Sequence, residues 1–267
     1  MIFTSSRYKE RSKGLQETNY ILGNKSDIFS IHYSCESFTK SKSSTPRVTS
    51  ISIYNIKTKE QICFNIHIEA QLRGYNCMRL SGDELDASER SLLQQFYKFV
   101  KNHQGCIWVH WNMKNYKYGF EALSIRYKLL TRRSAPKLKA HDHYNLDVLL
   151  RKLYGHNFEV NSCHSKLLNL SQRNNIPIKG MLLGIEEAKA FTAKNYQAIM
   201  ESSQSKAEAI GLIIKAAGEK GLKVNASLRE IYGISLLSVL LFIGDNFTKI
   251  KRIASAIGSL LIMLLVL

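Results

Sequence analysis

Aromatic and basic side chains are mixed between Trp108 and Tyr118, a combination that suits nucleic acid. Aromatic rings stack on bases, while lysine ammonium groups contact phosphates. The candidates for these roles are Lys114, Tyr116, Lys117 and Tyr118. Alternatively, Trp108 and either Tyr116 or Phe120 belong to the hydrophobic core, as a junction between a strand and a helix requires. Both interpretations stay open at this point.

A second group of cations follows closely in the sequence. No acidic residue occurs between positions 122 and 141, and this stretch holds Arg126, Lys128, Arg132, Arg133, Lys137 and Lys139. Single-sign runs are often only solvated surface, but this run creates a strong local field. It is the best candidate for contacts to phosphates.

The histidines and cysteines of the sequence do not predict a metal site or a cofactor site. His141 and His143 flank Asp142, but no third metal ligand follows at a telling spacing. Cys35 precedes Glu36, and a neighbouring carboxylate disfavours the reactive thiolate. Cysteines occur at positions 35, 63, 77, 106 and 163, without a Cys-x-x-Cys pair. This odd number argues against a disulfide framework and indicates a reducing compartment.

The elements that must position these residues can be read from apolar periodicity. Alternating and β-branched patterns predict strands at Asp27–Tyr33, Arg47–Ile56, Gln61–Ile68 and Cys106–Trp111. A capping box at Asp86–Glu89 predicts a following helix. Further helices are expected at Tyr116–Leu130, Asn145–Tyr154, Ser165–Arg173, Glu186–Phe191 and Ser205–Ala217. An antiparallel meander followed by an α/β crossover is the ribonuclease H-like order, which predicts an α/β fold.

Two segments resemble the DEDD 3′–5′ exonuclease superfamily, which shares that fold. Ile28–Phe38 is similar to its first strand, and Trp108–Arg126 to its second motif, with His143–Gly155 similar to the segment that follows. Such enzymes hold two metal ions with four carboxylates. This chain keeps Glu36 but has Ser34 at the first acidic position and Tyr116–Tyr118 where the second motif needs an aspartate, and Gln204–Glu208 lacks the late aspartate. The resemblance therefore implies a diverged nuclease-like domain with no catalytic residues, because one carboxylate cannot hold two Mg²⁺ ions.

The motifs Ser34–Phe38, His110–Met113, Tyr118–Leu123 and Gly184–Ala188 also resemble an uncharacterised bacterial family. In architecture, a basic body joined to two short apolar runs is similar to two-span membrane effectors of anti-phage systems, including those encoded beside retron reverse transcriptases. This similarity implies a membrane-acting toxin and a nucleoprotein partner of the reverse transcriptase–DNA type.

Composition supports a polyanionic partner. The 267 residues include 38 Lys and Arg against 21 Asp and Glu, a net charge of +17, of which all but +2 lies in the first 230 residues. Such an excess attracts nucleic acid or anionic lipid. With only 3 prolines and 45% hydrophobic residues, the chain belongs to none of the collagen-like or wholly disordered classes.

Two apolar runs close the sequence. Ile231–Gly244 has 14 residues without a charge, Asp245–Arg252 interrupts, and Ile253–Leu267 adds 15 uncharged residues. At 1.5 Å per residue each run spans about 21–22 Å, short of a hydrocarbon core of about 30 Å. Runs of this length are often core helices, but neither run has a polar face. The expected lipid contacts are Ile231, Leu236, Leu240, Phe242, Ile253, Ile257, Leu260 and Leu264.

The cations between the runs constrain topology. If both runs cross, Lys249, Lys251 and Arg252 face outward, against the positive-inside rule. Either one run crosses and the other lies in the interface, or the pair inserts conditionally. Since the N-terminus lacks a signal-peptide core, we expect a cytoplasmic main domain at the bacterial inner membrane.

These observations predict four regions: a flexible basic arm (1–25), a ribonuclease H-like domain (26–180), a helical extension (181–230) and a membrane-associated helical hairpin (231–267). The favoured function is a non-enzymatic anti-phage effector that docks nucleic acid or a nucleoprotein, perturbs the lipid bilayer and self-associates there. The first alternative is a membrane-anchored 3′–5′ exonuclease with the unusual metal ligands Glu36, Asp142 and Asp147. The second is a membrane-tethered adaptor that binds nucleic acid without affecting the membrane.

Overall fold

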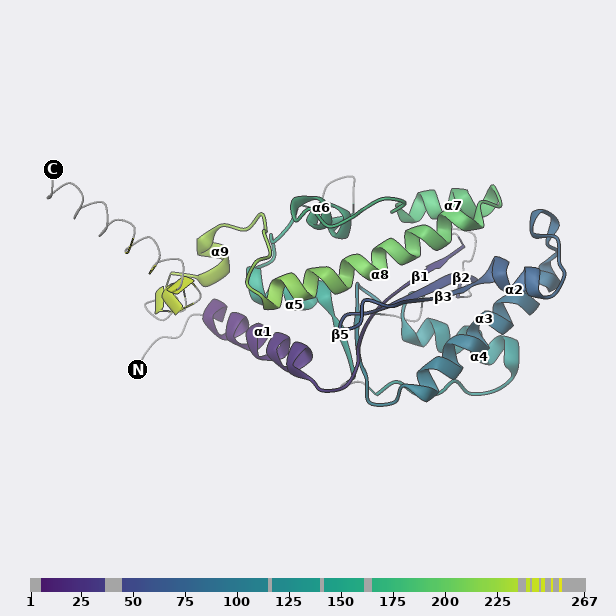
Figure 1. The fold of residues 1–267 in the computed structure, drawn as a ribbon, viewed down its shortest axis with the longest axis horizontal. Coiled ribbons are helices and arrows are strands. Elements are labelled where there is room, and N and C mark those ends of the chain that lie inside the picture. The colour runs from purple at the N-terminus through teal and green to yellow at the C-terminus, as the bar shows by residue number, and fades with distance from the viewer. Residues whose placement is uncertain are drawn as a thin grey trace, which may run out of the picture.

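A five-stranded mixed sheet forms the centre of the molecule (Figure 1). The computed structural model describes residues 6–36, 45–114, 117–139, 142–160 and 165–234, with 239–240, 242–244, 246–247, 251 and 255. The strands are β1 (Ile28–Cys35), β2 (Val48–Asn55), β3 (Gln61–Asn65), β4 (Ile107–His110) and β5 (His143–Asn145), in the order β3-β2-β1-β4-β5. The β1–β2 and β2–β3 pairs are antiparallel, whereas β1–β4 and β4–β5 are parallel. The predicted α/β class and the meander are confirmed.

Helices cover both faces of this sheet (Figure 1). One face carries α1 (Ser6–Gly23), α5 (Leu146–Tyr154), α6 (Lys166–Arg173) and most of α8 (Tyr196–Gly218). The other face carries α2 (Ile66–Leu72), α3 (Gly82–Asn102) and α4 (Phe120–Thr131). Helix α7 (Gly184–Thr192) packs on α8, and α9 (Leu228–Tyr232) contacts α1 and α5, while the 3₁₀ turn η1 spans Cys77–Arg79.

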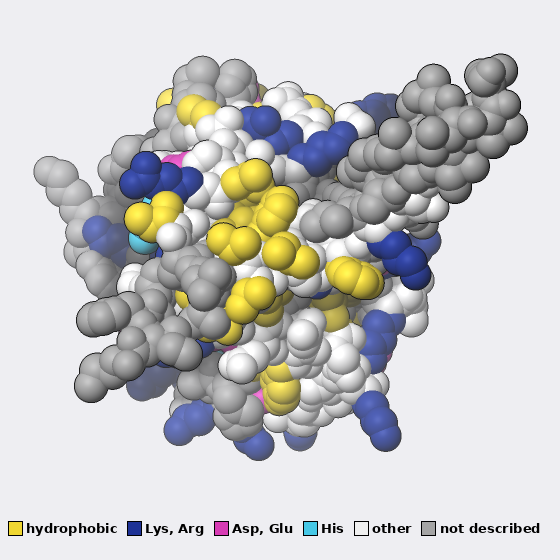
Figure 2. Space-filling view, turned by 90° about the vertical axis from the view of Figure 1, so that its left-hand side faces the viewer, with side chains coloured by type: hydrophobic (Ala, Val, Ile, Leu, Met, Phe, Trp, Pro, Cys, Tyr) yellow, Lys and Arg dark blue, Asp and Glu magenta, His cyan; other side chains and the backbone are white. Residues whose placement is uncertain are grey.

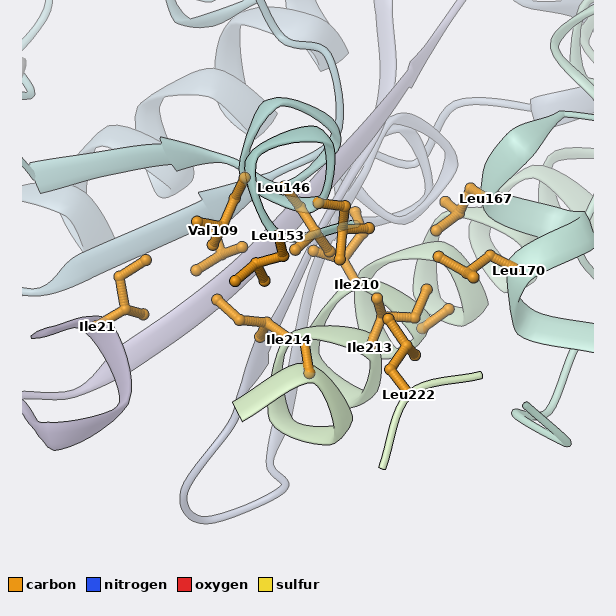
Figure 3. Packing of buried hydrophobic residues seen from close by; sticks show 14 of the residues in the cluster. Ile21, Val109, Leu146, Leu153, Leu167, Leu170, Ile210, Ile213, Ile214 and Leu222 are labelled. Carbon is orange, nitrogen blue, oxygen red and sulfur yellow. The ribbon is translucent and has the colours of Figure 1, made fainter. Parts of the chain in front are cut away.

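Two hydrophobic clusters fill the spaces between sheet and helices. Along β4 the side chains alternate, so that Val109 joins the cluster under α8 while Trp108 joins the cluster under α3. Figure 3 shows the first cluster, where Val109, Leu146, Leu153, Ile210 and Ile214 lie between the sheet and the helices. The close approach of α8 depends on Gly211, because an added Cβ atom would lie 2.7 Å from the ring of Tyr54.

The prediction of a mobile arm is wrong for residues 6–23, because these residues form helix α1. Its buried positions are Arg11, Gly14, Thr18 and Ile21, a narrow stripe with a single large apolar side chain. A stripe of this composition gives little amphipathic signal in the sequence. The helix is nevertheless fixed by packing against α5 and α9.

Several element boundaries also differ from the predictions. The alternating pattern predicted a strand to Ile68, but β3 ends at Asn65 and α2 begins at Ile66. Helix α3 begins four residues before Asp86, with a capping box between Ser81 and Glu84. Helix α4 begins at Phe120. Strand β5 was missed, because a three-residue strand has too short a pattern to detect.

Most of the expected hairpin, residues 231–267, lies outside the residues that the structure describes. None of the described helices is long and apolar enough to cross a bilayer.

Candidate functional site

A cavity of about 510 Å³ opens beside the carboxyl ends of the parallel strands β1 and β4. In open α/β sheets, ligands bind at this edge of the strands. Residues 32–36 of β1 and the segment after it form one wall, and α7 and α8 contribute others. Most of the lining is apolar, including Trp111, Leu167, Leu182 and Ile185. The size and lining are typical of a small-molecule site.

The charged groups on the α7–α8 side of this cavity neutralise each other. The ammonium group of Lys206 lies 2.6 Å from Oε1 of Glu187, and the hydroxyl of Ser202 donates to the same oxygen at 2.6 Å. Lys206 and Glu187 are both buried. A buried pair of this kind is stable only while both partners remain.

The β1 side of the cavity carries polar atoms with incomplete hydrogen bonding. Ser34 is buried, and its Oγ has no hydrogen-bond partner among the described residues, nor has Nε2 of His32. The hydroxyl of Tyr118 donates to the Tyr33 carbonyl at 3.0 Å and lies 3.3 Å from Nδ1 of His32. Burial, reinforced by the charge of Lys206, holds the pKa of His32 well below its ordinary value, so its imidazole is neutral.

Glu36 lies at the edge of the cavity and is tied into an ionic network. Its carboxylate lies 3.4 Å from Nη1 of Arg47, whose Nη2 lies 2.5 Å from Asp86. The same guanidinium lies 3.6 Å from the buried Glu89, which is also paired with Arg126. The motif residue Glu36 is therefore compensated by a cation of the protein itself.

The ligands considered for an exonuclease site do not form a metal cluster. Among the described residues, no group of three His, Cys, Asp or Glu side chains is close enough to hold an ion. Asp147 is buried and pairs with Arg151 at 3.0 Å, one helical turn further along α5. Asp142 lies before β5, and His141 falls outside the described part of the chain.

The thiol of Cys35 is not activated. Burial, then the carboxylates of Glu187 and Glu36, raise its pKa far above the ordinary range. The sequence argument gave the neighbouring carboxylate as the reason, but burial is the larger cause.

Most of the predicted phosphate-contacting cations are accessible. Lys114, Lys117, Lys128, Arg132, Arg133, Lys137 and Lys139 are exposed. We call the last five the basic run. Arg132 also lines a hollow beside α3 with the three carboxylate residues Asp83, Glu84 and Asp86 and one further cation, Arg90, so the carboxylates weaken the positive field of Arg132 there.

The structure corrects the prediction that Arg126 contacts phosphate. This side chain is buried and forms two hydrogen bonds with the carboxylate of Glu89, so it is not placed to contact phosphate. Burial lowers its pKa, but the hydrogen bond and charge of Glu89 outweigh burial and raise it. The residue holds α4 to α3 instead.

The aromatic stretch divides between core and cavity. Trp108 is core, as the alternative interpretation held, and its ring packs on Phe29 and Phe96. Tyr118 is half-buried, stacks on Tyr33 with 4.5 Å between ring centroids, and lines the cavity. Tyr116 lies outside the described residues.

Exposed apolar side chains gather at the end of the molecule that carries α9. We call this group the apolar end, and it comprises Leu228, Ile234, Val239, Leu240, Ile243 and Phe247. Figure 2 looks at that end and shows apolar side chains near its middle with Lys and Arg side chains around them.

The predicted lipid contacts have different outcomes. Leu240 is exposed, which a contact with lipid would require, and its contact with lipid stays a prediction. Ile231 is buried in the core, and Phe242 packs on Tyr232 with 5.3 Å between ring centroids, so both contact protein. The remaining candidates, Leu236, Ile253, Ile257, Leu260 and Leu264, lie outside the described residues.

Comparisons with known proteins do not assign this chain to a family. No protein-family model matches the chain, and no curated protein matches it significantly.

Sequence reasoning missed the cavity itself. His32, Glu187 and Lys206 come from β1, α7 and α8, which are distant in the sequence. The available signal was the set of motifs Ser34–Phe38, His110–Met113, Tyr118–Leu123 and Gly184–Ala188, each of which contributes residues to the lining.

Proposed function

We propose that this chain is a non-enzymatic, membrane-targeted effector of the anti-phage type, whose basic α/β domain docks nucleic acid or a nucleoprotein. The observation that carries the proposal is the basic run: five exposed cations on α4 and the loop after it, in a stretch without an acidic residue. Such a group provides the phosphate contacts from which sequence-independent affinity arises.

The fold supports a diverged ribonuclease H-like domain. The antiparallel meander β1–β2–β3 and the parallel crossover to β4 agree with the element order expected from the sequence, although β5 was not expected. The cavity lies at the strand ends, where the DEDD exonucleases that the sequence resembles hold metal ions. On α8 the wall of this cavity presents the cation Lys206, already paired with Glu187, in place of a further acidic ligand. This favours docking over phosphodiester cleavage.

The apolar end supports the membrane part of the proposal. A contiguous apolar surface rimmed by cations is typical of a contact with the lipid interface. The first of the two uncharged runs, Ile231–Gly244, begins in α9 at this same end. We expect the protein to sit at the inner membrane with this end against the bilayer, and to perturb the bilayer as an oligomer when triggered.

Binding of fluorescent single-stranded DNA, followed by anisotropy at several salt concentrations, tests the docking function. In the triple variant R133Q/K137Q/K139Q we expect weaker binding and a salt slope smaller by about 2, because each lost phosphate contact contributes about 0.7. The matched control is K9Q/K13Q/K25Q, three exposed lysines on or just after α1. An equal loss in both triple variants would contradict a localised docking surface.

One observation keeps the exonuclease alternative testable, namely the position of Glu36 at the cavity edge. That alternative predicts Mg²⁺-dependent release of nucleotides from single-stranded DNA, abolished in E36Q. Our proposal predicts no such release by either protein, and unchanged DNA affinity in E36Q.

A further inference from the structure

The cavity beside the ends of β1 and β4 is a second candidate site, separate from the basic run. Its volume of about 510 Å³ falls within the range of about 300–1,000 Å³ found for small-molecule sites. Aliphatic side chains form much of its wall, namely Leu167, Leu182, Leu183, Ile185 and Ala188. Trp111 and Tyr118 add aromatic surface. Contact with an apolar molecule removes such a wall from water, which is favourable.

The ionic side chains in the wall are compensated by the protein itself. Lys206 pairs with Glu187 at 2.6 Å, and Glu36 lies 3.4 Å from Arg47. A charged ligand gains full electrostatic stabilisation only by displacing one partner of a pair. The other charge is then left uncompensated at a buried or half-buried position, which is unfavourable. A neutral ligand leaves both pairs intact.

The pair of Lys206 and Glu187 also fixes helix α7, which forms one wall of the cavity. All residues of α7 are described, and Glu187 is the one that is buried. The hydroxyl of Ser202 on α8 donates to the same carboxylate oxygen at 2.6 Å. An anion that captured Lys206 would therefore loosen the wall that encloses it, whereas a neutral molecule can bind while α7 stays docked.

Other polar side chains of the wall are occupied within the protein. The hydroxyl of Tyr118 donates to the carbonyl of Tyr33 at 3.0 Å, and Oδ1 of Asn112 accepts from the side-chain amide of Asn145 at 3.3 Å. The hydroxyl of Ser165 caps the first turn of α6. The wall therefore offers these groups to a ligand only at the expense of internal hydrogen bonds.

Two polar atoms of β1 are closed to a ligand. Nε2 of His32 and Oγ of Ser34 have no partner among the described residues, but both atoms have almost no accessible surface. Affinity in this cavity must then come from apolar contact and not from hydrogen bonds or charge. We propose that the cavity binds a neutral, mainly apolar small molecule. Its source is either a free aromatic compound or the acyl chain of a lipid.

Titration with N-phenyl-1-naphthylamine, a neutral dye whose emission rises in apolar surroundings, tests this site. We expect saturable binding that is weakened by about 10-fold or more in A188F, because the added ring occupies part of the cavity. The matched control is A193F, since Ala193 directly follows α7 but does not line the cavity.

A second variant keeps the test independent of folding. Ile185 lines the cavity and is 66% exposed, so I185S changes a surface position. It should weaken dye binding about 3- to 5-fold, because apolar contact area is lost. I68S is its control, because Ile68 is an exposed isoleucine outside the lining.

An anionic dye tests the selection against charge. The compound 8-anilinonaphthalene-1-sulfonate has the same rings with one added sulfonate, and it should bind A188F and the unaltered protein equally, because it stays outside the cavity. Competition with the neutral dye separates the two sources. Displacement by 1-dodecanol indicates an acyl chain, displacement by carbazole indicates an aromatic compound, and displacement by neither would contradict the proposal.

The site does not depend on the proposed docking and membrane functions. R133Q/K137Q/K139Q should keep dye binding, and A188F should keep binding of single-stranded DNA. I234S/L240S should also keep dye binding, which separates the cavity from the apolar end. The proposal would be overturned by absence of saturable dye binding to the unaltered protein, by equal losses in A188F and A193F, or by binding of the sulfonate that A188F removes.

Discussion

Arg126 and Lys128 are two positions apart in α4 but have different surroundings. Lys128 is exposed, whereas Arg126 is buried against Glu89, a carboxylate with no exposed surface. The amide of Val48 also donates to Glu89 at 2.9 Å, which fixes the end of β2 to α3. The role of a cation in this stretch is therefore decided by burial and not by charge.

This difference predicts opposite outcomes for the two residues. R126Q should lower the free energy of unfolding by about 3 kcal/mol or more, because it leaves Glu89 buried without its main partner. K128Q should change it by less than about 0.5 kcal/mol, as surface substitutions do. Urea unfolding measures both. Similar stabilities for the two variants would contradict the structural role of Arg126.

His110 predicts a pH dependence of stability. Burial, then the charges of His143 and Lys114, lower its pKa to about 3, and Nδ1 accepts the amide proton of Met113 at 3.2 Å. The unfolded chain, with a histidine pKa near 6.5, takes up a proton that the folded protein excludes. Stability is therefore complete above about pH 6.5 and falls as the pH drops towards 3, by at most about 1.4 kcal/mol per unit for this residue.

The variant H110N keeps an acceptor for Met113 but removes the titrating group. Its loss of unfolding free energy between pH 6.5 and 4.5 should be smaller than that of the unaltered protein by about 2 kcal/mol. H156N, at an exposed position, is the control. Chemical denaturation at a series of pH values measures the slopes, and parallel slopes for all three proteins would contradict a buried neutral His110.

At the scale of elements, α1 shows how a polar helix is fixed. The guanidinium of Arg7 donates to the carbonyls of Ile231 and Lys152 at 3.0 and 2.6 Å, and Arg11 donates to the carbonyl of Leu153 at 2.5 Å. Arg11 also lies over the ring of Tyr232, 4.5 Å from its centroid. Two arginines thus join α1 to the end of α5 and to α9, next to the apolar end.

Close packing of α1 depends on Gly14. A Cβ atom added there would lie 3.0 Å from Cβ of Lys152 and 3.2 Å from the Leu153 backbone nitrogen, whereas at Gly23 it would meet nothing within 4 Å. G14V should therefore displace α1, lower the melting temperature by several degrees and increase proteolysis before residue 24. G23A should leave both unchanged. Equal protease resistance of the two variants would show that α1 is not docked through this contact.

The sequence predicted elements well where apolar periodicity was strong and poorly where side chains act through specific contacts. Strands β1, β2 and β4 and helices α5 and α6 were predicted within a few residues, because each carries a clear buried pattern. Helix α1 was missed because three of its four buried residues are arginine, glycine and threonine. The cavity was missed because β1, α7 and α8 meet only in the folded chain.

At the scale of the whole molecule, the basic run and the apolar end belong to different elements and separate tasks. The basic run lies on and after α4, on the sheet face opposite α1, and the apolar end lies on and beyond α9 (Figure 1). A protein with this arrangement can hold a polyanion with one surface while another contacts lipid.

The apolar end predicts binding to uncharged vesicles. In I234S/L240S we expect a several-fold loss of association with phosphatidylcholine vesicles, because two exposed apolar side chains no longer transfer into lipid. The matched control is L72S/M78S, two comparably exposed apolar residues in α2 and η1. Flotation measures the bound fraction, and equal losses in both variants would contradict a lipid-facing apolar end.

Co-flotation tests the central claim most directly. Fluorescent single-stranded DNA is mixed with phosphatidylcholine vesicles and the full chain at low salt, and the DNA in the floating fraction is measured. The account predicts that the protein carries DNA to the vesicles, and that R133Q/K137Q/K139Q floats normally while most of the DNA remains behind. Flotation of the unaltered protein without DNA, or equal DNA flotation with this triple variant, would contradict it.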